Sequence, residues 1–174
     1  DGLGTETVDL FFRLGMVRDV ADLYELQEGD IASLERLGDK SARNIVEAIA
    51  SSRNVPFERV LFALGIRFVG ETVAKKLANA FGSIDRLTAA TEEELMQVDE
   101  IGARIAGSVR AYFAHPSTSR LIARLKEAGV QMELSAERLA DRTDRLQGAT
   151  VVISGTFTLH SRDEYKTLIE QHGG

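Results

Sequence analysis

The chain has 174 residues, of which 44% are hydrophobic and 28% are charged, as in an ordinary soluble globular protein. It contains no cysteine, which excludes disulfides and cysteine-ligated zinc, and its three histidines are too scattered to indicate a metal centre. No apolar run approaches the roughly 18 residues of a membrane span and no signal-like segment opens the chain, so we expect a cytoplasmic protein.

The formal net charge of −6 argues at first against a nucleic-acid partner. Its distribution is uneven, however. Residues 1–35 hold nine acids against two bases, whereas residues 101–126 hold five bases and no acid. Residues 59–76 carry four bases and one acid. This asymmetry is compatible with one side that faces DNA and one acidic solvated side, although charge runs of this kind are usually only solvated faces.

Four glycines mark an internal repeat: Gly4, Gly38, Gly70 and Gly102 are 34, 32 and 32 residues apart. An aliphatic residue precedes each glycine, a small apolar residue follows it by four positions, and a larger one follows by seven. The i+4 and i+7 spacing predicts that a helix begins after each glycine. The residues in these three registers are Leu3, Leu37, Val69 and Ile101, then Val8, Ala42, Ala74 and Ala106, then Phe11, Ile45, Leu77 and Val109.

A shorter helix is predicted before three of the glycines, over residues 31–34, 57–64 and 91–97. Thr91 and Glu94 have the spacing of a capping box at the start of the last one. The first unit lacks such a helix, as though the chain were cut just inside a domain. Each unit is therefore expected to be a helix, a tight glycine turn and a second helix, with the aliphatic residue before the glycine packed between the two helices.

A longer period groups the units in pairs. Residues 15–23 resemble residues 82–87, and both stretches follow the helix of an odd-numbered unit. We therefore expect one helical pair over 1–53 and a second over 54–114. Pro56 suits a helix start, where its missing N–H costs nothing. The predicted fold of residues 1–114 is all-α.

The remaining residues change character along the chain. Residues 115–132 contain a predicted amphipathic helix that stops at Gly129. Residues 133–145 are polar and charged and are expected to form a linker. Residues 146–174 are predicted as a truncated α/β segment, with a β-branched strand over 150–153 and a helix from Ser161 to Gln171.

Glycine turns that begin helices expose unpaired backbone N–H groups, and the helix dipole adds partial positive charge there. Such a turn can bind an anion, and glycine was expected to supply both a positive φ and room for a bulky phosphate. A single glycine of this kind usually only caps its helix. Four at regular spacing indicate a row of anion sites, for which the phosphate backbone of double-stranded DNA is the natural ligand.

Several motifs resemble a known family. Gly2-Leu3-Gly4 before a helix is similar to the helix-hairpin-helix motif, and ALGIRFVGETVAK at 63–75 resembles the third hairpin of bacterial NAD-dependent DNA ligases. Residues 146–157 look like the start of a BRCT domain, whose phosphate would be held by Ser154 or Thr156 and a later lysine. The lysine-bearing region is absent, so no such pocket is predicted. The resemblance covers nearly the whole chain and implies the C-terminal region of such a ligase.

The resemblance implies non-sequence-specific binding of double-stranded DNA that positions a nick for ligation in replication and repair. NAD, Mg²⁺ and Zn²⁺ are implied for the full-length parent, and its other domains are implied partners. This chain has neither the family's Lys-x-Asp-Gly motif nor its four-cysteine zinc module. No catalytic residue, cofactor site or metal ligand is therefore expected in it, and it should be inactive alone.

The expected DNA contacts fall into two groups, the turn glycines and nearby basic side chains. The first glycine of the Gly-x-Gly hairpin is replaced in units two to four by Arg36, Phe68 and Glu100. Glu100 lies beside Asp99 and would repel a phosphate, which leaves open whether unit four contacts DNA. The predicted contacts are Gly2, Gly4, Gly38, Gly70 and Gly102, with Lys40, Arg43, Arg67, Lys75, Lys76 and Arg104.

Two other interpretations remain open at this stage. Paired helix-hairpin-helix units also occur in other DNA-repair and junction-binding proteins, which would give a different parent with the same DNA contacts. The chain could instead be a protein-interaction module of small helices with no DNA role, for which a net charge of −6 is more natural.

Overall fold

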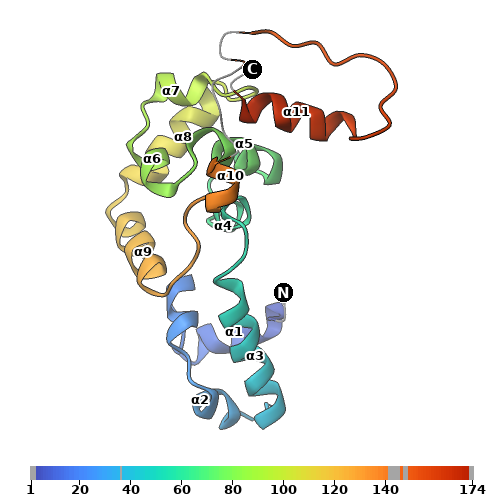
Figure 1. Cartoon of the computed structure of the whole chain (residues 1–174). Coiled ribbons are helices and arrows are strands. Elements are labelled where there is room, and N and C mark those ends of the chain that lie inside the picture. Colours follow the sequence, from blue (N-terminus) through green and yellow to red (C-terminus); the bar gives the residue numbers. More distant parts are fainter. Residues whose placement is uncertain (1–2, 36, 141–145, 147–148, 173–174) are drawn as a thin grey trace.

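The computed structural model describes residues 3–35, 37–140, 146 and 149–172, and Figure 1 shows its course. The described residues form helices and no strand, which confirms the predicted helical fold in its coarse form. The first half holds α1 (Thr5–Arg13), η1 (Val20–Glu25), α2 (Glu28–Ala32) and α3 (Asp39–Ser52). The second holds α4 (Phe57–Ala63), α5 (Glu71–Phe81), α6 (Ile84–Ala89), α7 (Glu92–Met96), α8 (Ala103–Ala114), α9 (Pro116–Glu127), α10 (Ala136–Ala140) and α11 (Arg162–Gln171).

Three helical hairpins follow one another along the chain: α2 packs on α3, α4 on α5 and α7 on α8. The helix predicted over 31–34 begins earlier than expected and ends at Ala32. The capping box at the start of α7 is confirmed, because the Glu94 amide donates to Thr91 Oγ1 at 3.2 Å and the Thr91 amide donates to Glu94 Oε2 at 2.8 Å. Pro56 is the N-cap of α4.

Most residues of the repeated registers are buried as predicted, whereas Leu3 and Leu37 are partly buried and Val8 is exposed. The alanines four residues after the turn glycines, Ala42, Ala74 and Ala106, are fully buried between the two helices of their hairpins. Val8, the equivalent residue of α1, is 37% exposed. The described residues provide no helix before α1.

The buried side chains form two clusters. The smaller cluster joins α1, α2 and α3 and includes Phe11, Ile31 and Ile45, whereas the larger one spans α4 to α9. Figure 1 shows α1–α3 at one end of the molecule and α4–α8 at the other, with α9 between them. Ala21 of η1 belongs to the larger cluster although it lies in the first half of the chain. The short helix η1 thus reaches across to the second half, as does Arg53 after α3, whose side chain donates to the Ala128 carbonyl at 2.6 Å.

The C-terminal helix predicted within 115–132 is α9, which is followed by Gly129 in the left-handed region at φ +83°. Part of the stretch predicted as a linker is packed against the second half. Leu134 is 4% exposed, and its amide donates to Gly82 O at 2.8 Å. Arg138 of α10 donates to Glu58 at 2.8 Å and to Asn79 at 2.7 Å. Residues 141–145 lie outside the described residues.

The strand predicted over 150–153 is not formed, and Val152 is 81% exposed. A strand needs a neighbouring strand to pair its backbone groups, and the described residues offer none. The helix predicted to begin at Ser161 is present as α11. Ser161 caps it, since the Glu164 amide donates to Ser161 Oγ at 3.2 Å and the Ser161 amide donates to Glu164 Oε2 at 2.6 Å.

Candidate nucleic-acid interface

Each of the four turn glycines is the residue before a helix. Gly4, Gly38, Gly70 and Gly102 have φ between −79° and −87° and extended ψ values, and none of their helices has a side-chain cap. By contrast, side-chain caps from Ser83, Thr91 and His115 begin α6, α7 and α9. The first-turn amides of α1, α3, α5 and α8 are therefore left without a side-chain acceptor.

The expectation that these glycines have a positive φ is wrong. The left-handed residue lies two positions earlier, at Phe68 (φ 67°) and at Glu100 (φ 64°). This is the position of the first glycine in the Gly-x-Gly pattern. The corresponding residues of the first two turns, Gly2 and Arg36, lie outside the described residues.

Backbone strain and internal packing do not explain the four turn glycines. A Cβ built on Gly4, Gly38, Gly70 or Gly102 meets no atom of this chain within 4 Å. Their extended backbone suits any residue, and a serine, asparagine or aspartate cap would stabilise the helix by a few tenths of a kcal/mol more than glycine. What glycine adds at these positions is unobstructed access to the amides of the first turn.

The turns share one backbone geometry. The amide of the aliphatic residue before the glycine donates to the carbonyl three residues back, from Leu37 at 3.1 Å, Val69 at 3.0 Å and Ile101 at 3.0 Å. Val69 and Ile101 are buried in the larger cluster, while Leu3 and Leu37 pack partly buried against the smaller one. Burial of this residue anchors each turn, so the amides that follow it are held in a fixed direction.

Most of the predicted basic contacts are exposed to solvent. Lys40, Arg43, Lys75, Arg67 and Arg104 all lie on the surface near the glycine turns. Arg43 Nε lies 3.5 Å from Glu28 Oε1, an exposed pair that contributes little to stability. Within the described part of the chain, Arg67 and Arg104 make no ion pair, so their charges remain available to an external anion.

Turns three and four lie against each other. The guanidinium carbon of Arg67 lies 4.8 Å from the centroid of the Phe68 ring, and that of Arg104 on α8 lies 4.0 Å from the same centroid. The Ser108 hydroxyl donates to the backbone carbonyl of Arg67 at 2.7 Å. The tips of two consecutive hairpins are thereby joined around one aromatic ring.

Lys76 is placed differently from the other predicted contacts. Its ammonium lies 2.9 Å from both Asp99 Oδ2 and Glu100 Oε2, and its side chain is only 12% exposed. Partial burial works to lower the pKa of Lys76, but the hydrogen bonds from Asp99 and Glu100 raise it above its ordinary value. The Lys76 hydrogen bond in turn lowers the pKa of Asp99. Lys76 therefore neutralises the acids that were expected to repel a phosphate at turn four.

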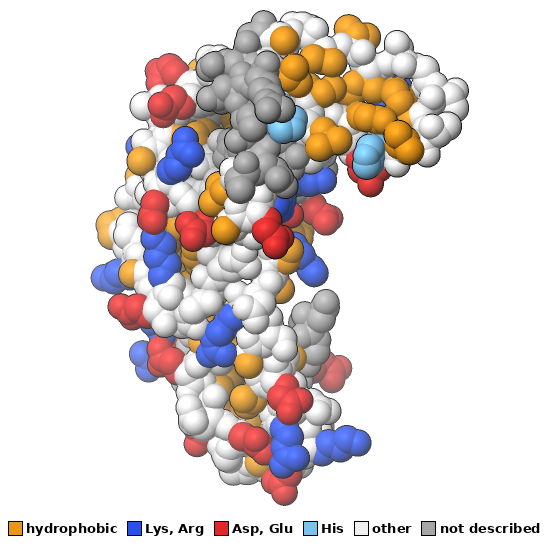
Figure 2. Space-filling model, in the orientation of Figure 1, with side chains coloured by type: hydrophobic (Ala, Val, Ile, Leu, Met, Phe, Trp, Pro, Cys, Tyr) orange, Lys and Arg blue, Asp and Glu red, His pale blue; other side chains and the backbone are white. Residues whose placement is uncertain are grey.

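Two of the five bases at 101–126, Arg124 and Lys126, are paired with carboxylates within the fold. Lys126 is paired with Asp85 at 2.7 Å, and Arg110 donates to the Thr88 carbonyl at 2.9 Å. Figure 2 shows acidic and basic side chains interspersed along the body of the molecule on the viewed face. The count of bases in this stretch thus overstates the charge that it offers to a ligand.

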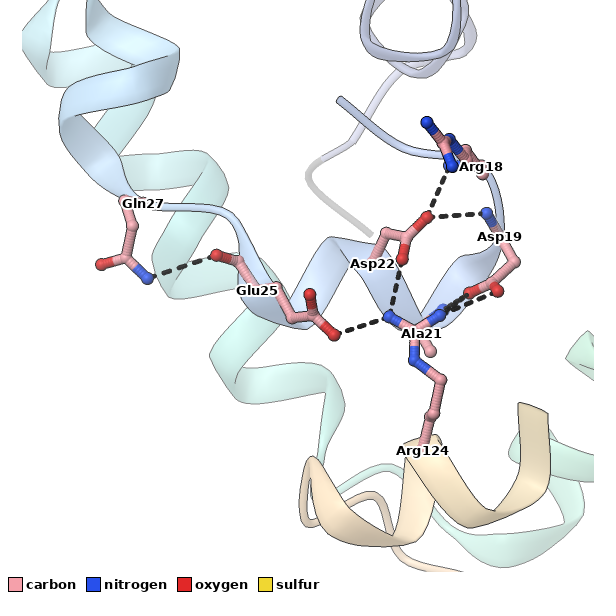
Figure 3. A network of polar contacts seen from close by, with 7 residues as sticks. All are labelled: Arg18, Asp19, Ala21, Asp22, Glu25, Gln27 and Arg124. Atoms are coloured by element: carbon pink, nitrogen blue, oxygen red, sulfur yellow. Dashed lines mark hydrogen bonds and ion pairs between the residues drawn. The ribbon is translucent and has the colours of Figure 1, made fainter. Parts of the chain in front are cut away.

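Arg124, also in that stretch, is the centre of an ionic network that the sequence did not reveal. Its guanidinium donates to Asp19 at 2.9 Å, to Asp22 at 2.6 Å and to Glu25 at 2.6 Å, as Figure 3 shows. Asp19 also caps η1 by accepting from the Ala21 amide. Because the three acids are on or next to η1 and Arg124 is on α9, the network ties the two halves of the chain together.

The described residues contain no group of three or more acidic or histidine side chains placed to hold a metal ion. Among the same residues, no helix has the length and apolar character that a bilayer crossing requires.

The sequence of residues 59–122, from α4 into α9, matches the helix-hairpin-helix motif. The whole chain is 59% identical over 174 residues to a protein of Bacteroides fragilis named DNA ligase. It is 51% identical over 174 residues to the DNA ligase of Flavobacterium johnsoniae and 48% identical over 172 residues to that of Porphyromonas gingivalis. Along its whole length the chain is thus similar to part of these DNA ligases. It spans about a quarter of the length of these ligases, 26% in each case, and so corresponds to a segment of them.

Proposed function

We propose that this segment binds the phosphate backbone of double-stranded DNA through the amides of its glycine turns. The observation that supports the proposal most is the empty space around all four turn glycines, which neither strain nor packing explains. A phosphate is an anion that must come close to the helix terminus, and a Cβ at the cap would stand in its way. Contacts of this kind position a duplex and read no base sequence.

In the ligase as a whole, the proposed role is to hold nicked DNA in place for NAD-dependent sealing. The chemistry, with its NAD, Mg²⁺ and Zn²⁺, is assigned to the parts of the ligase outside this chain, which are its proposed partners. Residues 1–53 and 54–114 are proposed as two pairs of helix-hairpin-helix units, and residues 146–174 as a BRCT-like segment. The separate burial of the two clusters supports the division into pairs.

Gly4, Gly38, Gly70 and Gly102 are proposed to bind phosphates through the amides that follow them, and Gly2 through its place in the first turn. Lys40, Arg43, Lys75, Arg67 and Arg104 add charge beside these turns. Lys76 acts through Asp99 and Glu100 and makes no direct contact in this scheme.

The test is binding of the chain to a nicked duplex by fluorescence anisotropy, for the wild type and a Gly38→Asp, Gly70→Asp double variant. Aspartate is a good helix cap, so the variant should keep its circular dichroism spectrum and melt at the same temperature or slightly higher. Its carboxylates would occupy the proposed phosphate positions, and we expect affinity to fall at least about tenfold.

Two matched variants separate charge from bulk and from position. Asparagine at the same glycines has the shape of aspartate without its charge, so we expect a smaller loss of affinity. Ser83→Asp adds a carboxylate at the N-cap of α6, beyond the end of α5 opposite to Gly70, and should leave binding unchanged. Equal binding by the wild type and the double aspartate variant would contradict the proposal.

A further inference from the structure

The aromatic residue at the third turn is in a costly conformation. Phe68 has a φ of +67°, a region that bulky side chains rarely adopt and that glycine adopts freely. Its ring is 39% exposed, so burial in the core does not account for its presence. A strained, half-exposed aromatic residue at a turn indicates that Phe68 has a function other than stabilising the fold.

The contacts of the ring indicate what that role is. The guanidinium carbons of Arg67 and Arg104 lie 4.8 and 4.0 Å from the centroid of the Phe68 ring. These arginines come from different hairpins, and a cation is attracted to the face of an aromatic ring at such distances. Without the Phe68 ring, the positive charges of Arg67 and Arg104 would repel each other and the two side chains would move apart.

The surroundings keep this pair of charges available. Neither arginine makes an ion pair within the described residues, whereas Arg124, Lys126 and Lys76 are all engaged by carboxylates. Glu100 and Asp99, the nearest acids of the fourth turn, are held by Lys76. Arg67 and Arg104 are thus two guanidiniums that share one aromatic ring and make no ion pair among the described residues.

We propose that Arg67, Phe68 and Arg104 form one phosphate site shared by the third and fourth turns, in which Phe68 is a positioning residue. The inference rests on the proposed function and deepens it. The repeat alone predicts one phosphate site at the third turn and another at the fourth, whereas here the two turns share a single site. Arginine forks match the oxygens of a phosphate, and two of them held together can grip one phosphate or two consecutive ones of a DNA strand.

The experiment measures binding of the full chain to a nicked duplex for Phe68→Leu, Phe68→Tyr, Arg104→Ala and the Phe68→Leu, Arg104→Ala double variant. Leucine keeps apolar bulk and removes the aromatic face, and we expect affinity to fall about five- to tenfold. Tyrosine keeps the face and should restore wild-type affinity. The loss of affinity in the double variant should be smaller than the product of the two single losses, because Phe68 and Arg104 act in one site.

Wild-type affinity in Phe68→Leu, or losses that multiply in the double variant, would overturn the shared site while leaving DNA binding by the turns intact. A wild type that does not bind the duplex at low salt would overturn the proposed function and this inference with it. Melting temperatures of all four variants show whether a loss of affinity accompanies a loss of fold.

Discussion

Arg124 Nη2 lies 2.6 Å from Asp22 Oδ1, although 102 residues separate them in the sequence. Asp19 and Glu25 complete the set of acids around the same guanidinium. Because α9 packs on α8 and on η1, and η1 packs on α3, this contact lies on the path that connects the two hairpin pairs. We expect this network, together with the Arg53 hydrogen bond to the Ala128 carbonyl, to hold the relative orientation of the pairs.

Arg124→Ala should lower the melting temperature by a few degrees, since three carboxylates would then face one another without a counter-charge. It should also weaken DNA binding without touching a turn. Arg120→Ala is the matched control, because Arg120 lies on the same helix, is exposed and has no ion pair among the described residues. Thermal melting and anisotropy measure both effects, and equal behaviour of the two variants would contradict this role.

The same network predicts a dependence of stability on pH. Hydrogen bonds from Arg124, and then from the Arg18 amide, lower the pKa of Asp22 from 3.8 to about 2. A carboxyl whose pKa is lower in the folded state stabilises the fold fully above pH 3.8, and this stabilisation is lost as the pH falls through about 2. Asp22→Asn should therefore be less stable than the wild type at pH 6, and the difference should vanish near pH 2. Urea midpoints across this range provide the measurement, and a difference that does not depend on pH would contradict the prediction.

Lys76→Ala should weaken DNA binding by exposing Asp99 and Glu100 beside the fourth turn. If Lys76 acts only through these acids, adding Asp99→Ala and Glu100→Gly to the Lys76 variant should restore affinity. A triple variant as weak as Lys76→Ala would show instead that the ammonium contacts DNA directly. The comparison uses binding to the same duplex at one fixed salt concentration.

The salt dependence of binding separates amide contacts from side-chain contacts. Each phosphate neutralised by a lysine or arginine adds a slope of about −0.9 to log K against log salt. Backbone amides carry no counterion-releasing charge, and the five basic side chains proposed beside the turns would contribute about −4.5, so we expect a total slope no steeper than about −5. A slope near −10, typical of a binder driven by lysine and arginine, would contradict the proposed mechanism.

The close approach of the hairpin helices makes a prediction for stability. Ala74 is fully buried four residues after its turn glycine. Ala74→Leu adds bulk that the α4–α5 contact cannot accept and should lower the free energy of unfolding by about 1–3 kcal/mol. Thr72→Leu, on the exposed face of the same helix, is the control and should stay within about 0.5 kcal/mol of the wild type by urea unfolding.

The sequence predicted the features of the fold that depend on regular spacing of residues along the chain. The turn glycines follow from a repeat of 32 to 34 residues, and the buried alanines such as Ala42 and the Thr91–Glu94 capping box follow from spacings of three or four residues. The strand at 150–153 was wrong because β-branched residues favour a strand only where a partner strand exists. The pattern of residues 150–153 alone does not show whether a partner strand is present.

The site was predictable in its glycines and only partly in its charges. Arg67 and Arg104 were named from their places beside the turns, but their meeting on Phe68 depends on two hairpins packing together. The pairing of Lys76 with Asp99 and the four-residue network of Arg124 are also long-range. The sequence shows an acidic stretch and a basic stretch far apart, which is compatible with such ion pairs. It does not indicate which acid pairs with which base.

The unfilled space around the turn glycines has a consequence for how this segment can change over generations. A Cβ at Gly38 or Gly70 meets no atom of the chain, so we expect a screen that selects for expression or heat resistance to accept substitutions there. A screen for affinity would reject the same substitutions. We therefore expect the stability of the fold and the affinity for DNA to vary independently at these positions. A substitution can change one without changing the other.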